Sequence, residues 1–233
     1  MAANYALILA GGSGSRLQNP IPKVFLKINK LYILEYSLIG FSNAANIDHI
    51  ILVVPQDYLQ QTQDLVQTKN YTKVVWICQG GNSRFESSMI AVNAIKESEA
   101  NVLIHDAARP FISETIINKC ISALKNDDAV NVLTPLSDSL VQLNPPNTIT
   151  TIDRSQYRQV QTPQGFRLSS IKKAQQLALK QHQQEITDDF SLVLQYKTGS
   201  TTWIEGNRLN FKITMEEDLE LARHLPQHTL VSI

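Results

Sequence analysis

A glycine-rich segment near the start of the chain has the composition of a phosphate-binding loop. Residues 10–23 read AGGSGSRLQNPIPK and directly follow an apolar run. The backbone N–H groups of such a loop approach a phosphate closely where no Cβ intervenes, and the positions without a Cβ are Gly11, Gly12 and Gly14. Arg16 would add a planar guanidinium and Lys23 a point charge, so both would neutralise a bound anion.

Two common nucleotide-binding motifs do not account for this loop. A P-loop ends in Gly-Lys followed by Ser or Thr, which GSGSRL lacks, and a dinucleotide fingerprint needs a third glycine where Leu17 stands. A different phosphate-binding loop and a glycine turn beside two solvated cations remain as alternatives. The loop follows the first predicted strand of an α/β sheet, and such sheets bind ligands at the carboxyl ends of their strands. That position favours phosphate binding.

A carboxylate and an arginine follow a later apolar run in the same way. Asp106 ends the stretch NVLIHD, where a carboxylate beside phosphates is suited to hold Mg²⁺. Arg109, immediately before Pro110, could bind a second phosphate. The structural alternatives are a turn cap for Asp106 and a surface ion pair for Arg109.

Lys212 is a third cation in a setting that suggests a site. It lies in NFKIT, residues 210–214, between Phe211 and Ile213. In an extended segment, alternate side chains point to opposite sides. Lys212 therefore points away from its apolar neighbours, and we expect it to reach the same site as Arg16 and Lys23.

The elements that must position these residues alternate between strands and helices. Short β-branched runs predict strands at 5–10, 49–55, 73–79, 101–106 and 129–135. Amphipathic segments predict helices near 33–45, 56–67, 83–97, 113–125, 168–182, 187–196 and 215–224. Parallel strands need crossover connections of this kind, so the pattern predicts an α/β fold with a mostly parallel sheet and helices on both faces.

The alternation is interrupted between about residues 136 and 160. Two short alternating stretches flank Asn144-Pro145-Pro146-Asn147, which predicts a β-hairpin that projects from the domain as an arm. An isolated hairpin is marginally stable in water, so we expect this one to rest against another surface, such as a second subunit. The chain shows no internal repeat or linker. We therefore expect one domain over residues 1–233.

Composition excludes several classes of protein. The 233 residues are 43% hydrophobic and 18% charged, which is typical of a globular protein. Lysine plus arginine equals aspartate plus glutamate at 21 each, so no overall field favours nucleic acid or an anionic membrane. The first apolar run has no cationic segment before it and is too short to span a membrane. Cys78 and Cys120 lie in apolar stretches without metal-binding spacing, which predicts buried thiols and a cytoplasmic protein.

Several motifs together resemble one family of enzymes along nearly the whole chain. In order and spacing they are similar to the 2-C-methyl-D-erythritol 4-phosphate cytidylyltransferase family, with the related ribitol-5-phosphate cytidylyltransferases as the nearest alternative. The resemblance implies a Rossmann-like domain with a projecting β-arm, a homodimer, CTP, a polyol phosphate and Mg²⁺. The motifs are LAGGSGSR followed by PK, GGNSRFESS (80–88), HDAARPF (105–111), DRSQYRQVQTPQGF (153–166), TDD (187–189) and NFKIT followed by EEDL (210–219).

The resemblance also assigns roles to individual residues. It implies that Arg16, Lys23 and Lys212 are catalytic, surrounding the triphosphate, and that Asp106 lies near the metal. The implied nucleotide-binding residues are Ala10, Gly11, Gly12, Gly14, Gly80, Gly81, Arg84, Ser87, Asp106 and Ala107. The implied residues for the second substrate are Arg109, Ser139, Arg154, Thr162 and Thr187, with Arg154 inserted into the partner subunit's site. Thr187 could instead be only a helix cap.

The implied reaction is attack by a polyol phosphate on the α-phosphorus of CTP. A phosphate monoester is already anionic near neutral pH, its second pKa being about 6, so His105 is interpreted as structural rather than as a base. The chain departs from the family at Val24, where glutamine is usual, and at Ser139, where threonine is common. The motifs favour methylerythritol phosphate over ribitol phosphate as acceptor. A non-catalytic nucleotide-binding protein is the alternative of another class, and the absence of Asp-x-Asp weakens a glycosyltransferase.

Overall fold

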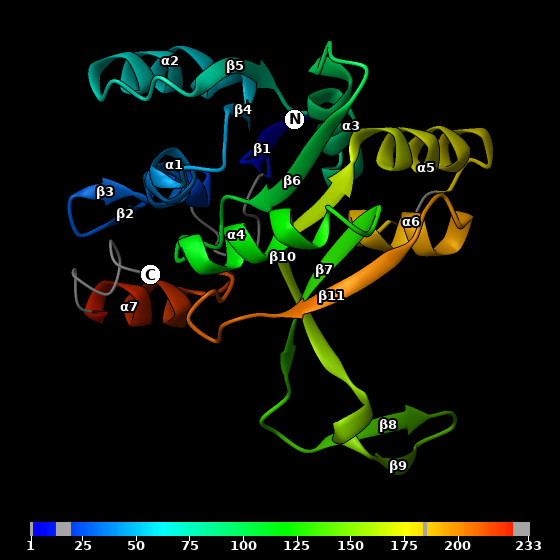
Figure 1. Ribbon diagram of the computed structural model, residues 1–233. Helices are drawn as coiled ribbons and strands as arrows, with labels where there is room; N and C mark the ends of the chain where they lie inside the picture. Colours follow the sequence, from blue (N-terminus) through cyan, green and yellow to red (C-terminus); the bar gives the residue numbers. More distant parts are fainter. Residues whose placement is uncertain (1, 13–19, 184–185, 226–233) are drawn as a thin grey trace.

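The computed structural model describes residues 2–12, 20–183 and 186–225. Their central feature is a seven-stranded sheet with the order β11-β7-β10-β6-β1-β4-β5 (Figure 1). The strands are β1 (Ala3–Leu9), β4 (His49–Val54), β5 (Val74–Gln79), β6 (Ala100–Asp106), β7 (Ala129–Pro135), β10 (Arg158–Arg167) and β11 (Thr201–Glu205). β10 is antiparallel to both neighbours, whereas the other neighbouring pairs are parallel. The predicted α/β class with a mostly parallel sheet is confirmed.

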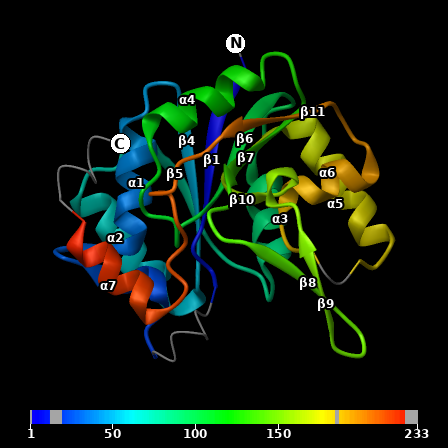
Figure 2. The same cartoon turned by 90° about the horizontal axis from the view of Figure 1, so that it is seen from below.

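Helices cover both faces of the sheet, as Figure 2 shows. The α1, α2 and α4 helices pack on one face and α3, α5 and α6 on the other. Strand residues alternate between the two cores: Ala6 and Ile8 of β1 face the first, Leu7 and Leu9 the second. The helices are α1 (Ile33–Asn43), α2 (Leu59–Thr68), α3 (Arg84–Ala94), α4 (Glu114–Ala123), α5 (Leu168–Lys180), α6 (Asp189–Tyr196) and α7 (Glu216–His224).

A third, smaller core holds α7 against the start of the chain. Ile213, Leu219 and Ala222 pack there with Ile28 and Phe111. Ile28 belongs to a short hairpin made of β2 (Lys27–Ile28) and β3 (Leu31–Tyr32). This packing brings the segment that carries Lys212 close to the segment that carries Lys23.

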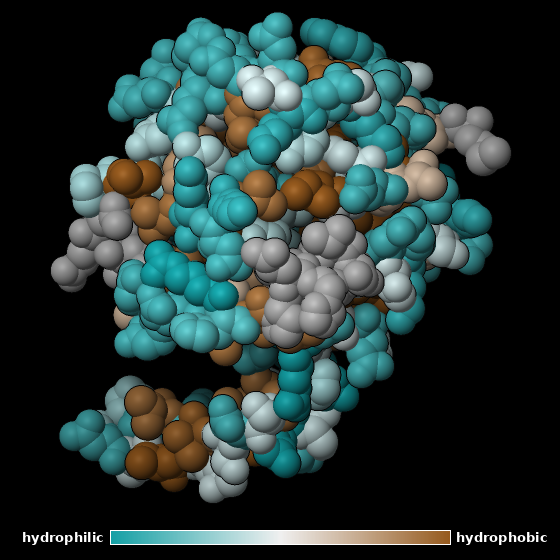
Figure 3. All heavy atoms as spheres, turned by 90° about the vertical axis from the view of Figure 1, so that its left-hand side faces the viewer, coloured by the Kyte–Doolittle hydropathy of each residue, from teal (hydrophilic) through white to brown (hydrophobic). Residues whose placement is uncertain are grey.

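The predicted arm is present as a separate two-stranded sheet. It consists of β8 (Leu140–Asn144) and β9 (Thr148–Ile152) and projects away from the main sheet (Figure 1). Apolar side chains gather on the arm, at the bottom of Figure 3, and the exposed fractions are 52% for Val141, 75% for Leu143 and 67% for Ile149. A hairpin of this size does not bury these side chains itself.

Two strands of the main sheet, β10 and β11, were not predicted, nor was the short β2–β3 hairpin. β10 reads RQVQTPQGFR and buries the polar side chains Gln161, Thr162 and Gln164, so its sequence lacks an apolar run. β11 is a short edge strand with Trp203 exposed. In the described ranges, no helix combines the length and apolar character needed to cross a membrane. Cys78 and Cys120 are buried free thiols, as expected.

Candidate active site

A cavity of about 490 Å³ opens at the carboxyl ends of β1 and β6. We call it the Asp106 cavity. Its position agrees with the rule that open α/β sheets bind ligands at the carboxyl ends of their strands. The residues that line it are Leu9, Ala10, Gly11, Gly12, Lys23, Val24, Gly81, Asn82, Ser83, Arg84, Ser87, Asp106, Ala108 and Lys212.

Glycines and the amino end of α3 form one wall of the Asp106 cavity. The Cα atoms of Gly11 and Gly80 face each other closely, because a Cβ built on either would lie 3.4 Å from the other's Cα. Ser87 Oγ accepts a hydrogen bond from Gly81 N at 3.1 Å. Ser83 caps α3 by accepting from Glu86 N at 3.1 Å, so the amino end of the helix faces the cavity. Helix amino ends attract anions. Gly14 and Arg16 lie outside the described residues.

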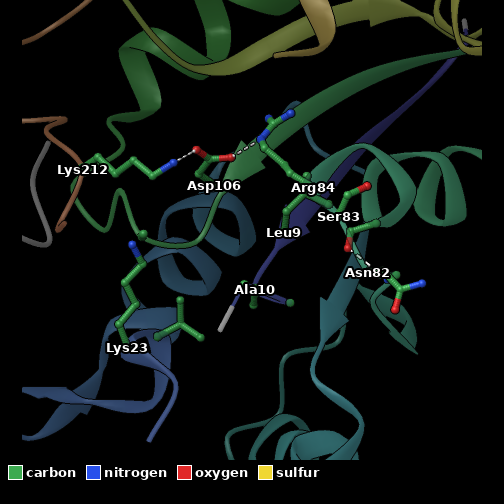
Figure 4. Close-up of a pocket in the computed structure, with 14 residues that line it drawn as sticks. Leu9, Ala10, Lys23, Asn82, Ser83, Arg84, Asp106 and Lys212 are labelled. Atoms are coloured by element: carbon green, nitrogen blue, oxygen red, sulfur yellow. Dashed lines mark hydrogen bonds and ion pairs between the residues drawn. The ribbon is translucent and has the colours of Figure 1, made fainter. Parts of the chain in front are cut away.

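Asp106 lies between two cations at the centre of this cavity. Its Oδ1 is 3.0 Å from Arg84 Nε and its Oδ2 is 2.7 Å from Lys212 Nζ. In Figure 4 the two cations approach the carboxylate from opposite sides. Burial would raise the pKa of Asp106, but Arg84 and Lys212 hold that pKa well below its usual range. Asp106 is therefore an anion at any physiological pH.

Two of the three predicted catalytic cations meet at this cavity. Lys23 and Lys212 both line it and lie on the same side (Figure 4). Lys23 Nζ donates to the carbonyl of Ile213 at 3.1 Å, and Ile213 N donates to the carbonyl of Ala108 at 2.8 Å. These bonds connect the start of the chain, the segment after β6 and the segment before α7. Residues separated by 189 positions are thereby held beside one ligand space.

Arg109 lines a second cavity, of about 510 Å³, at the base of the arm. We call it the Arg109 cavity. Lys212 lines both cavities, so the two adjoin. Arg109 Nη1 donates to Asn210 O at 3.0 Å and Nη2 to Val160 O at 3.2 Å, while the buried Nε has no partner among the described residues. Burial lowers the pKa of Arg109. A cation held by carbonyls rather than by a carboxylate is suited to bind an anionic ligand.

Arg208 is a cation of the Arg109 cavity that the sequence analysis did not identify. It is exposed, in the segment between β11 and α7. Nothing in its local sequence distinguishes it from a solvated surface arginine. Hydrogen bonds from Gln161 to Asn207 O and from Arg109 to Asn210 O hold its segment at the base of the arm.

Thr162 and His105 form a buried hydrogen-bonded link behind Asp106. Asp106 N donates to Thr162 Oγ1 at 3.0 Å, which leaves the Thr162 hydroxyl proton for His105 Nδ1 at 3.1 Å. His105 Nε2 then carries the ring proton and donates it to Arg109 O at 2.9 Å. Thr162 lines neither cavity, and its expected role in binding the second substrate stays a prediction.

The burial of His105 predicts a pH dependence of stability. Burial lowers its pKa to about 4, so the folded protein keeps the ring neutral while the unfolded chain, with a pKa near 6.5, takes up a proton. The free energy of unfolding should therefore fall by about 2 kcal/mol between pH 7 and pH 5 through this residue. Urea denaturation of wild type and His105→Gln at both pH values measures the difference.

The matched control is His182→Gln, since His182 is exposed. The His182→Gln protein should retain the wild-type dependence, whereas His105→Gln should lose most of it. Equal slopes in all three proteins would show that folding leaves the pKa of His105 near its ordinary value.

The remaining predicted substrate residues line neither cavity of their own chain, although Arg154 contacts Ser137, which lines the Arg109 cavity. Ser139 and Arg154 are exposed at the arm, and Arg154 Nη1 donates to the carbonyl of Ser137. Thr187 is exposed just before α6, and its hydroxyl donates to Asp188 Oδ2 at 3.2 Å. Asp188, not Thr187, caps α6 by accepting from Ser191 N at 3.0 Å. Thr187 is therefore not the helix cap that was the alternative to its substrate role.

The described residues do not form a metal site by themselves. Among them, no group of three or more His, Cys, Asp or Glu side chains is placed to hold an ion. Asp106 is the single acidic side chain among the described residues that line the cavity named after it. Mg²⁺ is commonly bound by one or two carboxylates together with substrate phosphates and water. The residues fit a Mg²⁺ that arrives with a nucleotide, with Asp106 as its protein ligand.

Comparisons with known proteins agree on one family. A sequence model described as IspD: 2-C-methyl-D-erythritol 4-phosphate cytidylyltransferase matches residues 5–227. A 2-C-methyl-D-erythritol 4-phosphate cytidylyltransferase of Lachnospira eligens is 34% identical over 94% of this chain and 97% of its own. A crystal structure of 4-diphosphocytidyl-2C-methyl-D-erythritol synthase from Anaerococcus prevotii superposes with a TM-score of 0.85, at 26% identity over 95% of each chain. The bifunctional ribulose 5-phosphate reductase/CDP-ribitol pyrophosphorylase Bcs1 of Haemophilus influenzae is 36% identical over 96% of this chain and 48% of its own.

Proposed function

This chain belongs to the 2-C-methyl-D-erythritol 4-phosphate cytidylyltransferase family, and from that membership we propose the reaction that its cavities perform. The enzyme transfers the cytidylyl group of CTP to 2-C-methyl-D-erythritol 4-phosphate, giving the CDP-activated polyol and pyrophosphate. The product is a precursor for isoprenoid synthesis. The observation that carries this proposal is that Lys23, Arg84 and Lys212 line one cavity at the edge of the sheet, where Arg84 and Lys212 pair with Asp106.

The reaction needs positioning and charge neutralisation rather than a covalent intermediate. The phosphate of the acceptor attacks the α-phosphorus of CTP, and the bond to the pyrophosphate leaving group breaks. The attacking group is already anionic near neutral pH, since its second pKa is about 6, so no general base is required. We assign the Asp106 cavity to CTP and the Arg109 cavity to the acceptor. Lys212, which lines both, would neutralise charge at the reacting phosphorus.

Mg²⁺ would be held by Asp106 and by phosphate oxygens of CTP. When bound, it would neutralise charge on the triphosphate and orient it for displacement. Arg84 and Lys212 each take one lone-pair position of Asp106, at Oδ1 and Oδ2. A carboxylate has about four such positions, so Asp106 would hold Lys212 and the metal together.

The arm supports a proposal of a homodimer. Ser139 and Arg154, which the family resemblance assigns to the second substrate, lie at the arm and line neither cavity of their own chain. The apolar side chains Val141, Leu143 and Ile149 are more than half exposed there, as their exposed fractions of 52%, 75% and 67% state. If a second subunit covers these side chains, Arg154 of each subunit would reach the Arg109 cavity of the other.

Both cysteines are reduced, from which we also infer a cytoplasmic location.

Pyrophosphate release tests the proposed reaction directly. The purified protein is incubated with CTP and Mg²⁺ and offered 2-C-methyl-D-erythritol 4-phosphate or D-ribitol 5-phosphate in separate assays. We expect turnover with the methylerythritol compound and a lower kcat/KM with the ribitol compound. The similarity to Bcs1 is the reason for the assay with D-ribitol 5-phosphate. One methylene changes binding by only about 1–3 kcal/mol, so some turnover of both is compatible with the proposal.

A preference for ribitol phosphate would assign the chain to that branch instead. If the protein binds CTP but turns over neither compound, a non-catalytic nucleotide-binding protein would be favoured. Omitting Mg²⁺ in parallel tests the metal, whose removal should abolish turnover.

A further inference from the structure

Arg84 connects the Asp106 cavity to a second, fully buried carboxylate behind it. The Arg84 Nε atom is 3.0 Å from Asp106 Oδ1, and its Nη1 is 2.6 Å from Asp189 Oδ2. Asp189 is 0% exposed and lies in the first turn of α6, on the far side of Arg84 from the cavity. We call Arg84, Ser88, Asp106 and Asp189 the Arg84 cluster.

The position of Asp189 is fixed from several elements. Its Oδ1 accepts from Ser88 Oγ of α3 at 2.5 Å, and Ser88 Oγ in turn accepts from Gln175 Nε2 of α5 at 3.2 Å. The backbone N of Asp189 donates to Gln164 Oε1 of β10 at 3.1 Å. Ser88 and Gln164 are both 0% exposed. The carboxylate is therefore held in place without help from solvent.

Asp189 determines which donor atom of Arg84 bonds to Asp106. A guanidinium and a carboxylate commonly pair through two parallel hydrogen bonds. Here Arg84 gives Asp106 only its Nε, while Nη1 is directed to Asp189 and Nη2 has no partner among the described residues. In the orientation that Asp189 holds, Nη2 does not bond to Asp106, and the second oxygen of Asp106 accepts from Lys212 at 2.7 Å. Burial would lower the pKa of Arg84, but Asp189 and then Asp106 raise it above its ordinary value.

The charges of the cluster lead to the same conclusion. Asp189 neutralises Arg84, so Asp106 keeps a net negative charge toward the cavity and attracts Lys212. Asp189 fixes the orientation of the guanidinium through Nη1. Without Asp189 the guanidinium could turn so that the unpartnered Nη2 joins Nε on Asp106, and Lys212 would lose its partner. A carboxylate outside the cavity thereby controls two groups inside it.

We propose that Asp189 is a positioning residue for cytidylyl transfer, because it holds Arg84 so that Asp106 can orient Lys212. This inference rests on the proposed function, since it takes the Asp106 cavity to be the CTP site. Asp189 touches no ligand space itself, because it lines neither cavity. Its effect passes entirely through Arg84.

The test is Asp189→Asn, which keeps the shape of the side chain but removes the charge and one of the two acceptor oxygens. We expect kcat/KM for CTP to fall about tenfold, which is the low end of what a hydrogen bond to a charged group contributes. The matched control is Asp188→Asn, the same charge change one residue away, at a helix cap where asparagine is equally suitable. That control separates positioning from the change in net charge.

A double-mutant cycle distinguishes positioning from a merely structural role. Because Asp189 acts through Arg84, adding Asp189→Asn to Arg84→Ala should cause no further loss of kcat/KM for CTP. In thermal denaturation, Asp189→Asn should lower the Tm of the wild type but raise the Tm of Arg84→Ala. Arg84→Ala leaves the buried charge of Asp189 unpaired, and Asp189→Asn removes that charge. Losses that multiply in the double variant would overturn the proposal.

Other outcomes also decide the question. If the wild type is active and Asp189→Asn has the same kcat/KM for CTP as Asp188→Asn, this inference is overturned. The proposed function would still stand. A wild type without turnover would contradict the proposed function first. If Asp189→Asn does not fold, Ser88→Ala, which removes one anchor of Asp189 without a charge change, should lower kcat/KM for CTP about threefold. An unchanged value for Ser88→Ala would then count against the proposal.

Discussion

Replacing Lys212 with alanine is expected to lower kcat by about 10²–10³-fold, the usual contribution of one well-placed electrostatic donor. Lys212 lines both the Asp106 and the Arg109 cavities, so it is the cation positioned to act where the two substrates meet. Steady-state kinetics with CTP and the methylerythritol acceptor, both saturating, measures the effect. KM for CTP should change much less than kcat, because Lys23 and Arg84 remain in the cavity.

Two further variants make this result specific. Lys212→Met keeps the apolar stem and removes the charge, so it should lose as much activity as the alanine variant. Lys173→Ala removes an exposed lysine from α5 and should retain wild-type kcat. The alanine variant should fold, since Asp106 keeps its ion pair with Arg84. A folded Lys212→Ala protein with near-wild-type kcat would show that Lys212 is not a catalytic residue.

Activity should appear when two inactive proteins, Arg154→Ala and Lys23→Ala, are mixed under conditions of subunit exchange. If the arm serves the partner's cavity, a mixed dimer contains one site with both residues intact and one that lacks both. Half of the dimers are mixed after exchange at equal concentrations, so recovery should approach about a quarter of wild-type activity. The pyrophosphate assay before and after mixing measures it.

The control for this experiment is a mixture of Lys23→Ala and Lys212→Ala. Both residues line the Asp106 cavity of their own chain, so each site in the mixed dimer lacks one of them. That mixture should stay inactive. Native mass spectrometry verifies exchange, and verified mixed dimers without recovery would show that Arg154 acts within its own subunit or not at all.

The sequence predicted the parallel part of the sheet because buried parallel strands carry a distinctive signal. HIILVVP and NVLIHD are nearly continuous apolar runs, since both faces of their strands are covered by helices. β10 carries no such signal. It lies between β6 and β7, yet it places Gln161, Thr162 and Gln164 in the interior, where their polar groups are hydrogen-bonded. A period of two cannot reveal a strand whose buried side chains are polar.

The same reasoning explains which parts of the site were visible. Lys23, Asp106 and Lys212 follow or interrupt apolar segments, so their types stand out against their surroundings. Asp189 stands in TDD before a helix, where an acidic residue is common for capping alone. Its contact with Arg84 joins residues 105 positions apart. Only the packing of α6 against α3 makes that pair, and no local pattern contains it.

β10 has a consequence for how this protein can change over time. It runs from Arg158, beside the base of the arm, to Gln164, which pairs with Ile104 of β6, and its register with β7 shifts between Gln161 and Gly165. Inserting or deleting a single residue in such a strand turns every following side chain to the opposite face of the sheet. The base of the arm and the floor of the cavity therefore share one strand. A change in the length of β10 at the arm would also reorient the side chains near Asp106.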